Sequence, residues 1–111
     1  MEIYISTGGF RSETASEVVA KFIQNGIKNI ELSGTKYASE NIAEISKLKD
    51  KVKLQIHNYF PPPKLPFVLN LASSDDKIYK KSFEHINNAL ETCAKLNCKY
   101  YSFHAGFLCD I

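Results

Sequence analysis

Apolar and polar residues alternate most clearly over residues 52–57, and this stretch organises the rest of the chain. Val52, Leu54 and Ile56 share one face of the pattern, and Lys53, Gln55 and His57 share the other. A period of two predicts a strand with two different faces. Prolines at 61–63 follow soon after, and they cannot continue a paired strand. The pattern therefore predicts a strand that ends on a histidine below a stiff loop, where α/β enzymes often place chemistry, although a lone histidine is more often structural.

The remaining periodicities predict three more strands, at residues 3–7, 27–33 and 99–106, and three helices. The first helix starts near Thr14, which has capping-box spacing with Glu17, and stops at Gly26. The second covers residues 39–49. The third is expected to have Ser73 or Ser74 as its N-cap and to run to about residue 96. On the third helix a buried stripe is expected at Tyr79, Phe83, Ile86, Leu90 and Cys93. His85, on the same helix, is expected at the surface or its boundary.

The order β-α-β-α-β-loop-α-β predicts a parallel sheet with crossover helices. One face of the strands is apolar and should meet the helices: Ile3, Ile5, Ile30, Leu32, Leu54, Ile56, Tyr101 and Phe103. The opposite face collects polar residues: Tyr4, Ser6, Glu31, Ser33, Gln55, His57, Ser102 and His104. Strands of doubly wound folds are apolar on both faces, so a polar inner face favours the mouth of a barrel. A full (β/α)8 barrel needs ~250 residues, so the 111 residues are expected to form its N-terminal half as one domain, residues 1–111.

Composition narrows the classes of partner. The net charge is +2, from 14 basic and 12 acidic residues, and the lysines are scattered along the chain. This balance favours neither a nucleic-acid surface nor a membrane surface. The sequence shows no signal-peptide pattern and no apolar run of membrane-spanning length, and its three cysteines are expected to be reduced thiols. A cytoplasmic protein is the expectation.

Three blocks of sequence resemble the xylose-isomerase-like TIM barrel superfamily. They are His-Asn-Tyr-Phe-Pro-Pro at 57–62, Phe-Val-Leu-Asn-Leu-Ala-Ser at 67–73 and Phe-His-Ala-Gly at 103–106. Residues 27–34 are similar to the family's second strand with its acidic residue, here Glu31. The superfamily groups sugar and sugar-phosphate isomerases and epimerases with apurinic endonucleases of the endonuclease IV class. The resemblance covers essentially the whole chain.

The resemblance implies different roles for the histidines in the two branches of the superfamily. In the endonuclease branch, the residues that match His57 and His104 bind metal in a multi-zinc cluster. In the isomerase branch, residues at these strand ends line the sugar pocket, and later strands hold a single divalent ion. The insertion at residues 61–66 departs from the endonuclease pattern, and we interpret it as a lid suited to a small substrate. Glu31, His57 and His104 are therefore the expected substrate-binding residues, and His57 and His104 the expected metal ligands.

Three hypotheses follow. The first, which we favour, is the N-terminal part of a metal-dependent sugar or sugar-phosphate isomerase or epimerase. The others are part of an apurinic endonuclease-like phosphodiesterase, and a non-catalytic half-barrel that acts through assembly. The complete enzyme would use Zn, Mn or Mg, whereas this chain is expected to lack a complete active site, and to hold no metal by itself, because two histidines fall short of the three protein ligands of a catalytic zinc. No catalytic residue is assigned. The expected partners are a sugar or sugar phosphate and a second copy that completes the barrel as a homodimer, with no nucleic acid and no membrane.

Overall fold

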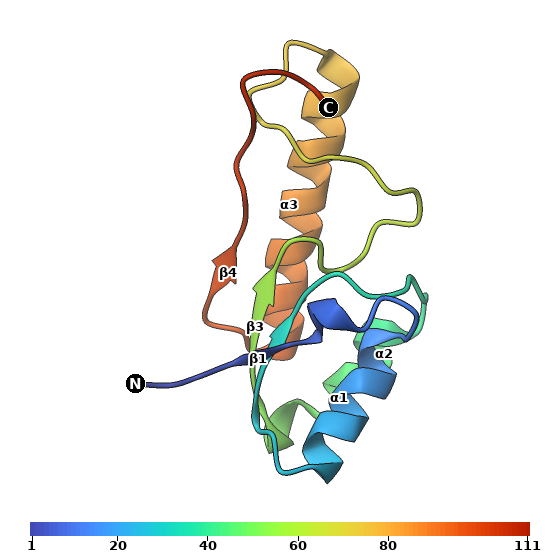
Figure 1. The fold of residues 1–111 in the computed structure, drawn as a ribbon, viewed down its shortest axis with the longest axis vertical. Helices are drawn as coiled ribbons and strands as arrows, with labels where there is room; N and C mark the ends of the chain where they lie inside the picture. The colour runs from blue at the N-terminus through green and yellow to red at the C-terminus, as the bar shows by residue number, and fades with distance from the viewer.

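Four parallel strands form a single sheet in the computed structural model, which describes residues 1–111 (Figure 1). In chain order they are β1 (Ile5–Ser6), β2 (Asn29–Leu32), β3 (Lys53–His57) and β4 (Tyr101–Ser102). Neighbours in the sheet are also consecutive in the chain, in the order β1-β2-β3-β4. The predicted fold class is confirmed, since a half-barrel requires this order of parallel strands with helical crossovers.

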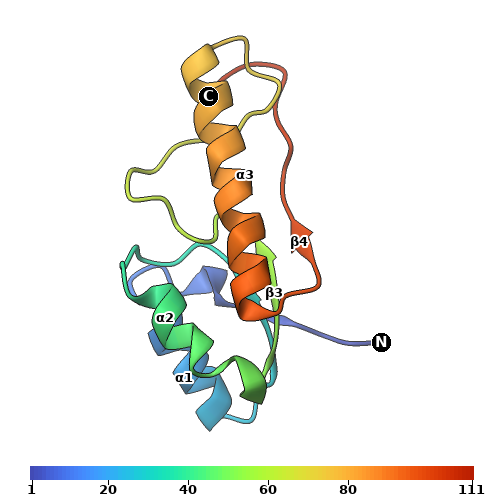
Figure 2. The same cartoon turned by 180° about the vertical axis from the view of Figure 1, so that it is seen from behind.

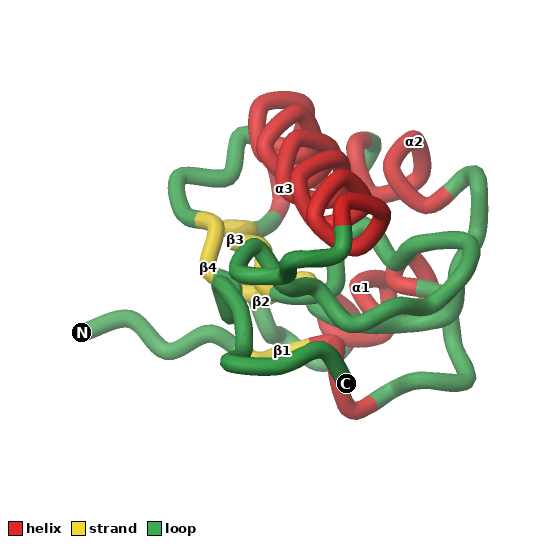
Figure 3. The backbone as a smooth tube through the Cα atoms, turned by 90° about the horizontal axis from the view of Figure 1, so that it is seen from above, coloured by secondary structure: helices red, strands yellow, loops and turns green.

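Three α-helices and two short 3₁₀ segments connect the strands. The α-helices are α1 (Ala15–Gln24), α2 (Asn41–Ser46) and α3 (Asp76–Leu96), and the 3₁₀ segments are η1 (Thr7–Gly9) and η2 (Lys49–Lys51). Viewed from above, the three α-helices flank the same side of the sheet (Figure 3). One apolar cluster joins these helices to the strands, and it includes Val18, Phe22, Ile30, Leu32, Leu54, Ile56, Ala89 and Leu96. The cluster places the core between the helices and a single face of the sheet.

The register of the central strands explains why that face is buried. Ile30 pairs with Leu54, and Leu32 pairs with Ile56, so apolar side chains stand in rows beneath the helices. The side chains of the residues between them point to the opposite face of the sheet. On that half-buried inner face, Glu31 pairs with Gln55. The alternation at residues 52–57 therefore predicted both faces of β3 correctly.

The two edge strands are shorter than predicted. β1 and β4 have two residues each, although the pattern gave residues 3–7 and 99–106. Ile3, Ile5 and Phe103 were expected against the helices, and all three are exposed. These residues lie at or beyond the ends of edge strands, where a neighbouring strand pairs on one side only.

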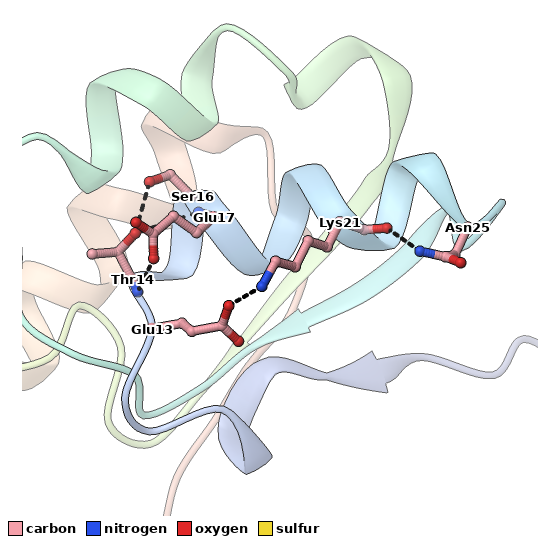
Figure 4. Close-up of polar contacts among 6 residues, drawn as sticks. All are labelled: Glu13, Thr14, Ser16, Glu17, Lys21 and Asn25. Carbon is pink, nitrogen blue, oxygen red and sulfur yellow. Dashed lines mark hydrogen bonds and ion pairs between the residues drawn. The ribbon is translucent and has the colours of Figure 1, made fainter.

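The start of α1 follows the predicted capping box (Figure 4). The Thr14 hydroxyl accepts the N–H of Glu17, and the Thr14 N–H donates to the Glu17 carboxylate at 3.1 Å. Asn25 caps the other end, and Gly26 follows with φ +77°, a left-handed conformation that glycine adopts without a steric penalty. Figure 4 also shows Lys21 in an ion pair with Glu13.

The N-terminus of α3 differs from the prediction. Its N-cap is Asp75, whose carboxylate accepts the N–H groups of Lys77 and Ile78 at 2.8 and 3.3 Å, and neither Ser73 nor Ser74 fills that role. α3 is the longest helix of the chain, but neither α3 nor the shorter helices have the length and apolarity that crossing a membrane requires.

The buried face of α3 was also predicted wrongly. Tyr79, Phe83 and Leu90 are 44%, 52% and 51% exposed. The face that meets the protein is formed by Ser82, His85, Ala89, Thr92 and Leu96. Ala89 and Leu96 of this face join the apolar core, and the hydroxyls of Ser82 and Thr92 donate to helix carbonyls one turn earlier at 2.7 and 2.8 Å. Of the predicted stripe, Ile86 and Cys93 are half-buried and Cys93 packs against the core, so apolar periodicity selected a stripe that is buried only in part.

Candidate functional site

His57 and His104 lie together at the carboxyl ends of two adjacent parallel strands. His57 is the last residue of β3, and His104 lies two residues after β4. Their ring centroids are 5.5 Å apart, and the ring planes meet at 80°. His57 is half-buried and His104 is exposed. The expectation that the two rings share one region is confirmed, and their roles in binding remain predictions.

Ser102 orients the ring of His57. His57 and Ser102 are register partners across β3 and β4, and the Ser102 Oγ lies 2.9 Å from Nδ1 of His57. When Nδ1 carries the proton and donates it to the hydroxyl, the lone pair of Nε2 is left free to bind a metal. The serine thus provides the kind of outer partner that metal-binding histidines use.

The spacing of the two rings fits a shared divalent ion. Two imidazoles bound to one tetrahedral zinc at ~2.0–2.1 Å per nitrogen have ring centres roughly 5 Å apart. The 5.5 Å separation is close to this value. No group of three or more His, Cys, Asp or Glu side chains forms a cluster that could hold a metal, so the pair supplies two ligands and no third. All three cysteines are free, as expected, and none joins the pair.

Glu31 lies on the same inner face, in the row of side chains that contains Gln55, two residues before His57. It pairs in register with Ser6 on one side and with Gln55 on the other. The Gln55 side-chain amide donates to Glu31 Oε2 at 3.2 Å, and neither histidine makes this contact. Because the Glu31 carboxylate keeps an oxygen free of protein donors, the inner face retains an acceptor level with Gln55, two residues before His57 in the sheet.

Asn70 is a site residue that the sequence analysis passed over. It is buried within segment 67–73, and its side chain bonds to the segment that carries His104. The signals in the sequence were its place in the resembling block at 67–73 and the single amide inside the apolar run Phe-Val-Leu-Asn-Leu. A buried polar side chain in such a run needs partners, and here it has three.

The proline-containing loop, residues 61–66, does not cover the histidines. It lines a hollow of about 370 Å³ with Lys81 and His85 of α3, and another of about 400 Å³ with Thr35 and Tyr37 of the β2–α2 connection. Seen from either side, the loop projects away from β4 (Figures 1 and 2). The interpretation of this insertion as a lid over the site is therefore wrong, because the loop packs on the helix side of the molecule.

His85 supports the base of this loop. It is only 5% exposed, contrary to its expected place at the surface, and its ring packs against Tyr59 and Phe67 with centroids 5.5 and 6.0 Å away. Burial lowers the pKa of His85 from its ordinary value, and the buried Nε2 has no hydrogen-bond partner. His85 is thus a neutral core residue, with no place in the histidine pair.

Comparisons with known proteins agree with this fold. Residues 19–110 match the family model described as xylose isomerase-like TIM barrel. A curated relative, the probable endonuclease 4 of a Sulfurihydrogenibium species, is 42% identical over 40 residues, which are 36% of this chain and 14% of the relative.

A solved structure has a similar fold, the TTHB071 protein from Thermus thermophilus soaked with ZnCl₂. It matches with a TM-score of 0.64 and 21% identity over 96% of this chain and 41% of that protein. The chain thus spans less than half the length of the proteins it matches. The family model matches most of the chain, and the parallel sheet agrees with it, so this chain belongs to the xylose isomerase-like TIM barrel family.

Proposed function

We propose that this chain supplies the His57–His104 part of a divalent-metal site in a sugar or sugar-phosphate isomerase or epimerase. The observation that carries the proposal is the 5.5 Å separation of the two rings at the ends of adjacent strands. The hydrogen bond with Ser102 supports it, because a proton held on Nδ1 and donated to the hydroxyl leaves Nε2 of His57 available as a ligand.

The residues of the inner face have separate roles in this proposal. His57 and His104 would hold the ion, which polarises a sugar carbonyl or hydroxyl when it is bound. Glu31 and Gln55 would orient substrate hydroxyls, since their hydrogen-bonded pair still offers an acceptor oxygen and a donor N–H. Further ligands would come from other strands of a complete barrel, supplied by a longer chain or by a second copy.

Two observations bear on the choice of substrate. The net charge of +2 and the scattered lysines favour a small polyhydroxy substrate over a DNA surface. The second candidate, an apurinic endonuclease-like phosphodiesterase, is favoured by the 42% identity to probable endonuclease 4 over 40 residues. The pairing of both histidines also fits that branch, in which the matching residues bind zinc.

Zinc titration by calorimetry tests the metal site. The chain should bind one Zn²⁺ weakly, and His57→Ala or His104→Ala should each abolish the binding, because one remaining imidazole holds zinc poorly. Glu91→Ala, which removes an exposed carboxylate from α3, is the matched control and should bind as the wild type does. Zinc binding that survives both histidine substitutions would contradict the proposal.

The substrate class requires an activity measurement. The longest natural polypeptide that contains this sequence should interconvert sugar or sugar-phosphate isomers when loaded with Zn, Mn or Mg. Cleavage of abasic DNA without any sugar isomerisation would instead select the phosphodiesterase candidate. Both assays should be run with the His57→Ala variant, because a loss of activity in that variant ties the reaction to this site.

A further inference from the structure

The side chain of Asn70 joins two segments that lie far apart in the sequence. Its Oδ1 accepts the N–H of Phe107, 37 positions away, at 3.0 Å, and also the N–H of Ala72 at 3.0 Å. Its Nδ2 donates to Oδ1 of Asp110 at 2.7 Å. One side-chain amide thus makes three hydrogen bonds in a residue that is 2% exposed.

The backbone of Asn70 is fixed independently by α3. The Asn70 N–H donates to the Ser82 hydroxyl at 2.8 Å, and that hydroxyl donates to the carbonyl of Ile78 at 2.7 Å. Ser82 is fully buried. The helix therefore sets the position from which the Asn70 amide reaches the C-terminal segment.

Gly106 allows the two segments to meet. A Cβ atom built on Gly106 would lie 2.5 Å from Oδ1 of Asn70 and 3.2 Å from the backbone nitrogen of Ala72. Nonbonded atoms do not approach so closely without displacement, so a side chain here would push the Asn70 amide out of place. The close approach of segments 67–73 and 103–110 thus depends on this glycine.

His104 lies between two anchors. On one side, Ser102 belongs to β4 and pairs with His57. On the other side, the Ala105 carbonyl accepts the N–H of Leu71 at 2.9 Å, and the bonds of Asn70 follow at Phe107 and Asp110. No strand continues past Ser102, so the contacts with segment 70–73 are what hold the exposed chain on the far side of His104.

We propose that Asn70 is the positioning residue of the histidine pair, because its amide fixes the segment that holds the His104 ring beside His57. The consequence for metal affinity rests on the proposed function, whereas the ring contact itself does not depend on it. A second anchor matters because two ligands on separate segments bind one ion only when both segments are held.

The role of Asn70 can be tested by reversing its hydrogen bond with Asp110, through exchanges of Asn and Asp that keep the shape of the side chains. Asn70→Asp keeps the acceptor for both backbone N–H groups but replaces the donor Nδ2 with an oxygen that faces the Asp110 carboxylate. Asp110→Asn alone is the matched control. In the wild type the Ser73 hydroxyl donates to Asp110 at 2.8 Å. In the variant, the new amide can turn its oxygen toward Asn70 and its NH₂ toward Ser73. The double variant restores one donor and one acceptor in reversed order.

Two readouts separate positioning from general stability. Nuclear Overhauser contacts between the ring protons of His57 and His104 should be present in the wild type, absent in Asn70→Asp and present again in the double variant. Zinc affinity should fall about tenfold in Asn70→Asp and recover in the double variant. Both are measured at a temperature where circular dichroism shows every variant folded.

The outcomes decide the proposal in either direction. Ring contacts that persist in a folded Asn70→Asp variant would overturn it. If Asn70→Asp does not fold, the double variant decides, because a folded double variant without ring contacts would overturn the proposal equally. A wild type that shows the ring contact but no zinc binding would contradict the proposed metal site and leave the role of Asn70 standing.

Discussion

The hydroxyl of Ser102 lies 2.9 Å from Nδ1 of His57, across the register pair that joins β3 to β4. The serine is exposed and the histidine half-buried, so this bond contributes more to the orientation of the ring than to the stability of the fold. It also fixes which ring nitrogen faces away from the sheet. In the proposed metal site, that nitrogen is the ligand.

We therefore expect Ser102→Ala to weaken zinc binding about tenfold while changing the free energy of unfolding by less than about 0.5 kcal/mol. Calorimetric titration and urea denaturation measure the two quantities. Ser102→Thr keeps the hydroxyl and is the control, with zinc affinity near that of the wild type. Equal zinc affinity in the alanine and threonine variants would show that the hydroxyl does not orient His57.

The capping box of α1 gives a prediction about stability. Thr14→Ala removes the acceptor for the Glu17 N–H at the start of a ten-residue helix that carries four core residues. The free energy of unfolding should decrease by about 1 kcal/mol, the usual cost of losing such a cap. Urea denaturation followed by circular dichroism measures the change. Thr14→Ser preserves the hydroxyl, and a loss of the same size in that variant would place the effect in the lost methyl group.

His85 gives the stability of the fold a dependence on pH. Burial lowers the pKa of His85, so the unfolded chain takes up a proton at a higher pH than the folded chain does. At pH values above about 6.5, the pKa of His85 in the unfolded chain, His85 adds no pH dependence to the free energy of unfolding. Below that value the free energy of unfolding should decrease, until the pH reaches the lower pKa of the folded state.

His85→Phe should remove this part of the pH dependence. The phenyl ring can fill the space beside Tyr59 and Phe67 and has no unpaired Nε2, so the variant should be about 1 kcal/mol more stable than the wild type at pH 5. Urea titrations at pH 5 and pH 8 provide the measurement. His104→Gln, at an exposed position, is the control, and the slope between the two pH values should persist in that variant. A slope that also persists in His85→Phe would mean that other groups cause it.

Elements with strong periodicity could be predicted from the sequence, and elements that depend on distant partners could not. β3 and α1 alternate or repeat clearly, and Thr14 marks the start of α1, so local signals sufficed there. The pairing of His57 with His104 followed from their equivalent places at the ends of parallel strands. For α3, the buried face is Ser82, His85, Ala89, Thr92 and Leu96, and its polar members have partners or neighbours that periodicity does not show, such as the Asn70 N–H that donates to Ser82.

The contacts of Asn70 could not be predicted because they join residues 37 and 40 positions apart through an irregular C-terminal segment. No periodicity describes such a segment. The direction of the proline-containing loop was equally hidden, since the sequence shows that the loop is stiff but not which side of the sheet it covers.

The open edges of the sheet lead to the prediction of self-association. β1 and β4 are both edge strands, and apolar side chains in or next to them are exposed, among them Ile5 in β1 and Ile3 just before it. An unpaired edge offers backbone donors and acceptors to another strand, and closure of a barrel removes such edges. We propose that two copies associate about a twofold axis and join their sheets at these edges.

Sedimentation at micromolar concentration should then show a dimer. The double substitution Ile3→Lys and Ile5→Lys should shift the chain toward monomer, because lysines on an edge strand oppose pairing with another strand. Leu65→Lys combined with Tyr79→Lys is the matched control, since it adds the same charge at exposed apolar positions on the proline-containing loop and α3. A folded wild type that sediments as a monomer at every concentration would exclude the dimer. Dissociation of both double variants to the same extent would assign the effect to net charge, whereas dissociation of the edge variant alone would place the interface at β1.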